Sequence, residues 1–438
     1  MEDVGLASGL IALALLAGAG AIVIQVSSGD PGSKVFQTRL FFAALMLRFA
    51  ASLAIYQFGF INTIKDEDGS GWVAGMVYNQ AWEQQGRTVT DLPAMVVDAY
   101  ETKNKGYYHL LGWFFFVTGL QGRLAAAALN CSFGAMTVVL TYRTARLLLT
   151  IRGASWAGWC SCLFPSLILW SAQTVKEPVV IFLESVVLYA TLRLRMSLLN
   201  PKYLFLCGGA IILLMPFRFY AAYVSVIAVL LGLLAGGSRA GRIPGVFAAG
   251  LLAAVLIAAF GGFLQKERSA DYMDLKYIES FRRNSAIGEG SGSAAYIEAD
   301  LSSSVGFGLA MAFGGVHLLF APFPWQWTSL RAMLVAPETI FWWWLCWRYV
   351  GPGLWYASRK RLADFAPLLL FVVLMALLYS VMFSNVGLAY RQRAQLLPWL
   401  FVLGGLGRER HLCRMASPRR LIMTPGGIPR AKSVAGIV

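Results

Sequence analysis

Three adjacent carboxylates, Asp66, Glu67 and Asp68, directly follow an apolar block near the start of the chain. Because neighbouring carboxylates repel one another, at least one should have a raised pKa unless a cation lies nearby. One interpretation is a general base, with or without a divalent cation such as Mg²⁺ or Mn²⁺ on Asp66 and Asp68. The other is a solvated turn, which the following Gly69–Gly71 segment favours.

Cations stand at the ends of other apolar blocks. Lys176 precedes Glu177 and Pro178, where a helix should begin. Capping explains Glu177, but a cation at a helix N-terminus is unfavourable unless an anion is bound nearby. Arg218 follows Pro216 at an expected helix break, and an ionisable residue near membrane depth is costly. A phosphate contact and snorkelling to the headgroups are the two readings of Arg218.

A third group of candidates is Tyr390, Arg391 and Arg393, at the start of the last apolar block. A pair of guanidiniums suits a phosphate through forked, charge-assisted hydrogen bonds. We therefore predict that Lys176, Arg218, Arg391 and Arg393 form a phosphate cradle.

Isolated histidines and tryptophans are less specific. His109 and His317 have no cysteine or histidine partners at metal-ligand spacing, so structural roles are favoured for both. Trp325 belongs to a Trp-rich stretch that is typical of interfacial belts, and stacking on a sugar ring is the sharper alternative.

Composition indicates what positions these groups. Of 438 residues, 58% are hydrophobic and 13% are charged, and the apolar residues form long blocks. A helical span needs about 20 such residues, whereas barrel strands would alternate over about ten. The sequence predicts an all-α, polytopic transmembrane bundle with about 11 spans. The expected spans are about 5–26, 38–60, 123–147, 154–172, 177–197, 203–215 with 217–236, 243–262, 331–350, 364–384 and 391–407.

Charge bias orients these spans. Five basic clusters fall on one side if two short helices dip and return at Pro216, which puts the N-terminus outside and the C-terminus inside. Residues 1–407 then form a single transmembrane domain with outer loops at about 61–122 and 263–330. The apolar stretch Tyr107–Gly119 is too short to span and is expected to be an interfacial helix. Residues 408–438 form a basic cytoplasmic tail that we expect to be disordered.

The net charge of +15 is compatible with nucleic-acid binding, which we reject. The basic residues lie in short loops and in the tail, where anionic lipid heads are their natural partners. We expect a multi-pass protein of a bacterial inner membrane, with the acidic cluster and the cations facing the periplasm.

Several motifs in this order resemble the membrane-embedded glycosyltransferases of the GT-C superfamily, in particular the protein-mannosyltransferase-like and aminoarabinose-transferase-like branch (glycosyltransferase family 39). They are Asp68 with Trp72, the stretch Gly106–Trp113, the stretch Phe164–Pro178, and Tyr390-Arg391-Gln392-Arg393. Many relatives have Asp-Glu at the catalytic position. Here Glu67 precedes Asp68, which leaves open whether Asp66 or Asp68 is the base.

The resemblance implies a GT-C-like fold and an enzyme that takes a sugar from a polyprenyl-phosphate donor at the outer face. Asp68 or Asp66, with Glu67 beside them, would activate a hydroxyl of a glycan, lipid or protein acceptor. The cradle would hold the leaving phosphate. The remaining implied contacts to substrate are Tyr108, His109, Glu177, Trp325 and Tyr390. The loop from Gln265 to Asp300 could close over the site as a lid.

Two rival functions stay open. A polysaccharide polymerase or O-antigen-ligase-type enzyme would also hold polyprenyl-linked glycans with outer-face arginines. A lipid-linked sugar transporter or flippase would need a continuous polar path, and the expected spans carry few charges at mid-depth. No cofactor is certain, and a divalent cation remains open.

Overall fold

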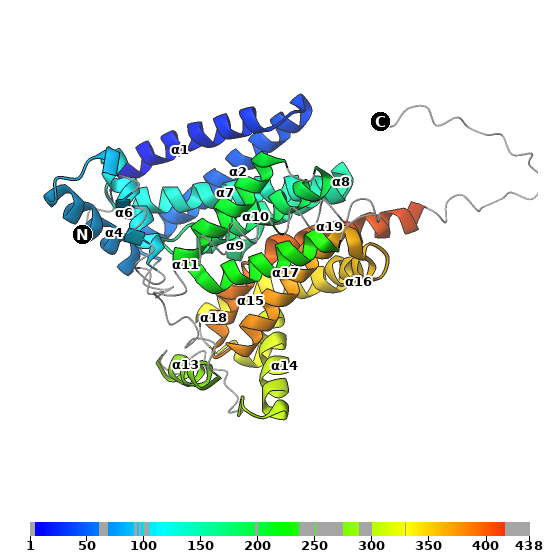
Figure 1. Ribbon diagram of the computed structural model, residues 1–438. Coiled ribbons are helices and arrows are strands. Elements are labelled where there is room, and N and C mark those ends of the chain that lie inside the picture. Colours follow the sequence, from blue (N-terminus) through cyan, green and yellow to red (C-terminus); the bar gives the residue numbers. More distant parts are fainter. Residues whose placement is uncertain are drawn as a thin grey trace, which may run out of the picture.

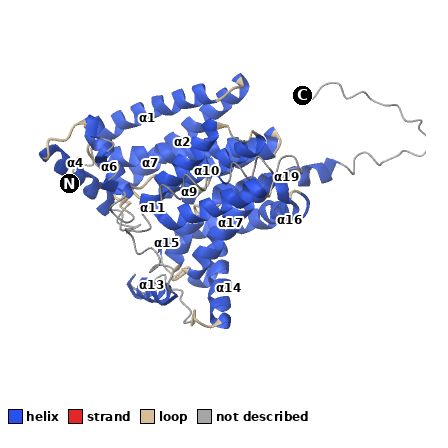
Figure 2. Ribbon diagram, viewed as in Figure 1, coloured by secondary structure: helices blue, strands red, loops and turns tan. Residues whose placement is uncertain are grey.

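The computed structural model describes residues 5–60, 69–91, 94–95, 98–99, 105–197, 200–235, 250, 275–288, 300–328 and 330–416. Within these ranges the regular structure is helical and contains no strand (Figure 2). The predicted all-α class is confirmed. Asp66–Asp68, the expected span 243–262 and most of the expected tail lie outside the described residues.

The elements follow one another along the chain with short connections. They are α1 (Leu6–Ser27), α2 (Pro31–Gln57), α4 (Gly69–Gln84), η1 (Val89–Asp91), α6 (Gly106–Thr118), α7 (Arg123–Leu148), α8 (Ile151–Leu163), α9 (Pro165–Ser171), α10 (Glu177–Met196), α11 (Pro201–Leu234), α13 (Leu275–Gly288), α14 (Ser304–Phe320), η3 (Pro324–Gln326), α15 (Leu330–Leu345), the π-helical η4 (Cys346–Val350), α16 (Gly351–Lys360), α17 (Leu362–Val381), α18 (Val386–Arg393) and α19 (Leu397–Ala416).

Five of the described helices are long and apolar enough to cross a membrane: α1, α2, α7, α11 and α17. These agree with predicted spans, and a multi-pass membrane protein is the class that such helices indicate. Two other predicted spans are corrected. The span 154–172 is interrupted at Pro165, because proline cannot donate the helical hydrogen bond. The span 391–407 is divided between α18 and α19.

Local signals explain where several helices begin and end. Asp30 caps α2 by accepting a hydrogen bond from Ser33 N, and Pro31 stands at the first turn. The predicted Tyr107–Gly119 helix is present as α6. It ends at Gly119 in the left-handed region (φ 66°), which glycine adopts without strain.

Helix α7 forms the centre of the bundle. It packs against α1, α2, α8 and α10, and 83% of its most apolar stretch is buried. Figure 1 shows α7 and α10 between α1 on one side and α17 on the other. Ala125–Ala128 are fully buried, and such small side chains let neighbouring helices approach closely.

The predicted reversal at Pro216 is confirmed. Arg218 leaves helical geometry (φ −160°, ψ 82°) within α11 and ion-pairs with Glu177, the first residue of α10. Further along, Gly232 lies against Pro367, near the start of α17. Because Arg195 at the end of α10 also donates to Asp364 O, the second half of α11 returns toward the end from which the first half starts.

The bundle therefore has two functional ends, named here for their residues. The Glu177 end contains the start of α10, the kink of α11, the end of α17, and α18. The Arg143 end contains the ends of α7 and α10 and the starts of α2 and α17. The helices in between hold the two ends apart.

Candidate functional site: a cation cluster around Glu177

Glu177 is the centre of the Glu177 end. Its side chain is fully buried, and each carboxylate oxygen accepts a hydrogen bond from a different arginine. Arg218 Nη2 donates to Oε1 at 2.7 Å, and Arg391 Nη2 donates to Oε2 at 2.8 Å. The carboxylate thus fixes two guanidiniums that come from sequence positions far apart.

Arg218 is held from a second side. Its Nη1 donates to the Tyr379 hydroxyl at 3.1 Å, and its side chain is almost completely buried. Gln395 extends this network: its amide nitrogen faces Glu184 Oε1 at 3.2 Å, and its amide oxygen accepts from Arg218 Nη1. A buried cation needs such a complete set of partners, so the position of Arg218 is rigidly defined.

Arg391 is more accessible than Arg218, because 29% of its side chain is exposed. Its guanidinium carbon lies 5.7 Å from the centre of the Trp170 ring, which places an aromatic face beneath the charge. Arg391 can therefore meet a ligand from outside while Glu177 holds it from within.

Lys176 stands next to this pair. Burial, followed by the nearby Arg218, lowers the pKa of Lys176 from 10.5 to about 8. No described residue accepts a hydrogen bond from its ammonium group. At neutral pH the cluster thus presents three cations, Lys176, Arg218 and Arg391, around the single carboxylate of Glu177. This excess of positive charge suits an anion such as a phosphate.

The loop that presents Lys176 is anchored by neutral side chains. Asn130 Nδ2 donates to Gln173 O at 2.6 Å and to Val175 O at 2.7 Å, and also contacts the Tyr107 hydroxyl at 2.9 Å. Thr174 N donates to the Tyr56 hydroxyl at 3.1 Å. The loop between α9 and α10 is therefore fixed by α2, α6 and α7 together.

Helix α4 reaches the same loop. A side-chain carbon added at Gly71 would meet Thr174 O at 2.8 Å and the Tyr107 ring at 3.2 Å, so only glycine fits there. The acidic motif precedes this contact in the sequence. Asp66, Glu67 and Asp68 themselves lie outside the described residues. Among the residues that are described, no group of three His, Cys, Asp or Glu side chains could hold a metal ion.

Arg393 is not brought to the cluster. Two residues apart on a helix point in nearly opposite directions, so Arg391 and Arg393 face different surroundings. The fully buried Arg393 donates from Nη1 to Ala321 O at 2.9 Å and to Leu319 O at 3.3 Å. It holds the turn after α14 in place.

Three other predicted contacts lie around the site with partners of their own. The Tyr390 hydroxyl donates to Glu338 Oε2 at 2.6 Å. His109 is buried among aromatic rings, with Tyr78 at 4.2 Å between ring centres, and burial lowers its pKa to about 4. Tyr108 is partly exposed on the same helix, whereas Tyr107 contacts the Lys176 loop through Asn130.

Trp325 is the most accessible of the predicted contacts. Its side chain is 72% exposed and stacks on Phe323, with ring centres 4.8 Å apart and planes 8° from parallel. This leaves one ring face open. Sugar stacking at Trp325 stays a prediction.

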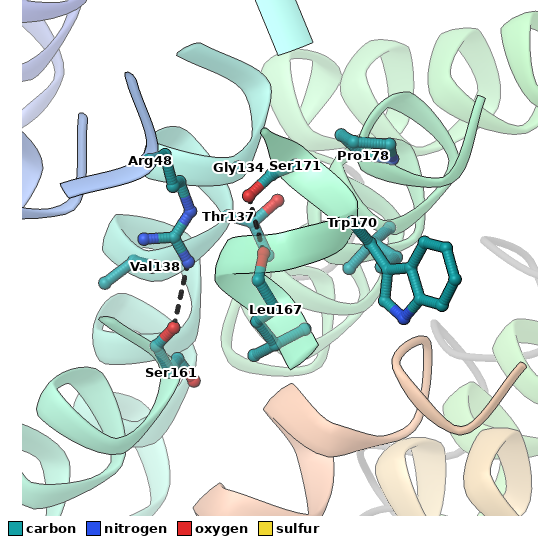
Figure 3. Close-up of a pocket in the computed structure, with 10 residues that line it drawn as sticks. Arg48, Gly134, Thr137, Val138, Ser161, Leu167, Trp170, Ser171 and Pro178 are labelled. Atoms are coloured by element: carbon teal, nitrogen blue, oxygen red, sulfur yellow. Dashed lines mark hydrogen bonds between the residues drawn. The ribbon is translucent and has the colours of Figure 1, made fainter. Parts of the chain in front are cut away.

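Sequence reasoning missed Arg48, which lies fully buried within α2. It donates to Ser161 O at 3.0 Å and to Cys162 O at 3.2 Å, where α8 ends before Pro165 (Figure 3). A cation at the C-terminus of a helix offsets its dipole, so this contact has a structural account. The small cavity beside Arg48 is lined on its other side by Trp170 and Pro178 (Figure 3).

Tyr379, Gln395 and Glu184 were also missed. Glu184 follows Glu177 by seven residues, which places both carboxylates on one face of α10. That spacing was visible in the sequence. The approach of Tyr379 and Gln395 depends on how α10, α11 and α17 pack, and no local pattern signals it.

Comparisons with known proteins concern the fold. No family model matches the chain, and no curated protein matches it. Among solved structures it is similar to the apo oligosaccharyltransferase of Archaeoglobus fulgidus, with 11% identity and a TM-score of 0.47 over 87% of this chain and 51% of that one. The same archaeal enzyme, AglB, in complex with an inhibitory peptide and a dolichol-phosphate gives 11% and 0.45 over 90% and 52%.

ArnT from Cupriavidus metallidurans bound to undecaprenyl phosphate gives 14% identity and a TM-score of 0.37, over 75% of this chain and 57% of that one. The chain spans little more than half the length of these proteins. They are GT-C membrane glycosyltransferases, the superfamily that the sequence motifs resemble. The roles of individual residues rest on the contacts within this chain.

Proposed function

We propose that the chain is a membrane glycosyltransferase that transfers a sugar from a polyprenyl-phosphate donor to an acceptor of the cell envelope. The observation that carries the proposal is the cluster in which Lys176, Arg218 and Arg391 surround one buried carboxylate. Its excess positive charge, at one end of an apolar bundle, suits a phosphate carried by a lipid.

Each cation has a distinct part in this proposal. Arg218 is locked by Glu177 and Tyr379 and supplies fixed positive charge beneath the phosphate. Arg391 and Lys176 are more accessible and supply direct hydrogen bonds. When the bond from the anomeric carbon to the phosphate oxygen breaks, its electron pair goes to that oxygen. Preorganised cations stabilise the charge as it develops.

The base is assigned to Asp68 or Asp66, which remains the expectation from the sequence motif. The carboxylate would take the proton of the acceptor hydroxyl as its oxygen attacks the anomeric carbon. Gly71 lies against the Lys176 loop, and three residues of chain reach at most about 11 Å. Chain connectivity therefore keeps Asp68 within reach of the cation cluster. A divalent cation on Asp66 and Asp68 remains part of the proposal, and loss of transfer with a chelator would test it.

The experiment is to incubate purified protein in vesicles with a panel of polyprenyl-phosphate sugars and to follow the lipid products by intact mass. We expect one donor to be converted to polyprenyl phosphate. Asp66→Asn or Asp68→Asn should abolish the conversion. Asp91→Asn, in the same predicted loop but engaged with Thr88 N, is the matched control and should keep it.

Two outcomes would contradict the proposal. Full conversion by well-folded Asp66→Asn and Asp68→Asn variants would remove the acid–base role. Movement of intact lipid-linked sugar across the vesicle without consumption would instead identify a transporter.

A further inference from the structure

The Arg143 end contains a second pair of cations, which the proposed function does not use. Arg143 Nε donates to Gln37 Oε1 at 2.5 Å, and its Nη2 donates to Ser28 Oγ at 2.7 Å. Gln37 is itself held, because its amide nitrogen donates to Ser33 Oγ at 2.7 Å. The guanidinium is thus fixed by neutral groups from the junction between α1 and α2.

Arg193 lies close enough to act electrostatically on Arg143. Its Nε donates to the Tyr189 hydroxyl at 2.9 Å, and its guanidinium carbon lies 5.4 Å and 5.9 Å from the ring centres of Tyr189 and Tyr203. It too is held by neutral partners. Two like charges therefore face one another without a carboxylate between them.

The described carboxylates at this end are engaged elsewhere. Asp30 caps α2 through Ser33 N at 2.8 Å. Asp364 pairs with Arg361 at 2.9 Å. Glu409 accepts from Thr150 N at 2.8 Å. None of the three contacts Arg143 or Arg193.

The free edges of the two guanidiniums can be reached from outside. Both side chains are partly exposed. Arg143 Nη1 and both terminal nitrogens of Arg193 have no acceptor among the residues that the structure describes. Donors from two helices that converge in this way suit the oxygens of a phosphate, and the repulsion between the cations is offset when such an anion binds.

The surroundings favour a lipid over a free ion. Val26, Val35 and Phe205 are 83%, 52% and 79% exposed, and each stands two residues from Ser28, Gln37 or Tyr203. α1, α2 and α11 are among the helices that can cross a membrane, so this apolar surface adjoins the bilayer. Basic pockets between such helices bind anionic headgroups.

We propose that Arg143 and Arg193 bind the phosphodiester headgroup of an anionic membrane lipid, whose acyl chain lies against Val35 and Phe205. The site is separate from the Glu177 end and needs no catalysis to operate. It would tie the ends of α1, α2, α7, α10 and α11 together.

The test compares binding of phosphatidylglycerol, phosphatidylcholine and inorganic phosphate to the purified full chain, by native mass spectrometry and by the lipid-induced shift in Tm. We expect Arg143→Gln/Arg193→Gln to weaken phosphatidylglycerol binding by about tenfold or more. Arg143→Lys/Arg193→Lys should keep most of it. Arg359→Gln removes an exposed arginine that stacks on Trp355 at the same end, and should have no effect.

Three results would overturn the proposal. One is wild-type lipid binding by the folded Gln double variant, and another is an equal loss in Arg359→Gln. The third is a Tm shift produced as well by inorganic phosphate, because the site would then take a free anion and not a lipid. Retained binding in the Lys double variant guards against a general folding defect.

Discussion

The two ends of the bundle hold their arginines in different ways. At the Glu177 end, Arg218 and Arg391 share a fully buried carboxylate, and Arg218 continues into Tyr379. At the Arg143 end, Arg143 and Arg193 are positioned by an amide and by hydroxyls. The first arrangement fixes the direction of the charges, and the second leaves their charge uncompensated.

That difference bears on what each end can do. Charges that are fixed in advance need no reorganisation when a negative charge develops nearby, which is what a transfer reaction requires. Charges held by neutral partners attract a resident anion but do not distinguish a ground state from a transition state. The comparison therefore assigns chemistry to the Glu177 end and ligand-dependent packing to the Arg143 end.

The sharpest test of this contrast removes the shared carboxylate. Glu177→Ala leaves Arg218 and Arg391 facing each other, and breaking a buried ion pair in this way costs about 3–5 kcal/mol. Thermal unfolding in detergent measures the loss. Glu409→Ala is the matched deletion at the Arg143 end, where the carboxylate only caps Thr150 N, and should cost about 1 kcal/mol. Equal losses would remove the distinction between the two ends.

Catalysis should depend on one end only. Lys176→Ala removes a direct contact to the developing charge and should lower kcat/KM by about 10²–10³-fold, the usual effect of losing one such donor. Steady-state kinetics with the identified donor would measure it. Arg143→Gln, at the other end, should leave kcat/KM within about twofold. A comparable loss in Arg143→Gln would break the assignment.

The pH dependence sharpens the role of Lys176 further. Because its pKa is about 8, Lys176 is cationic below that pH and becomes neutral above it. KM for the phosphate donor should therefore rise as pH increases from 7 to 9, by up to about tenfold per pH unit above the pKa. Lys176→Arg stays charged throughout and should remove this rise. A rise that persists in Lys176→Arg would assign the titration to another group.

The smallest effect is expected at His109. Burial lowers its pKa to about 4, so it is neutral at physiological pH, and it lies among aromatic rings. His109→Phe should change activity less than about threefold and stability by less than about 1 kcal/mol. Activity and unfolding assays on this variant would check both. A loss as large as that of Lys176→Ala would place His109 among the substrate contacts.

Much of the frame could be predicted from the sequence. Long apolar blocks fix the helical class, and Pro216 with Arg218 marks the reversal within α11. The interruption at Pro165 was missed because the surrounding residues are uniformly apolar, and hydropathy alone does not show where an apolar helix is broken.

The candidate site was predicted in part. Lys176, Arg218 and Arg391 were selected because each is a cation where a cation is costly, and the fold brings them together. Arg393 was selected by the same reasoning, but helical geometry turns it toward the Ala321 carbonyl. Arg48 was missed because one arginine inside a long apolar helix gives no sign of which carbonyls it will meet.

The most direct test of the account is the binding of polyprenyl phosphate to the purified protein, measured against the matching polyprenol without phosphate. The account predicts that Lys176→Ala and Arg391→Gln each weaken binding of the phosphate by about tenfold or more and leave binding of the alcohol unchanged. Wild-type affinity for polyprenyl phosphate in both folded variants would show that the cations around Glu177 do not hold the donor.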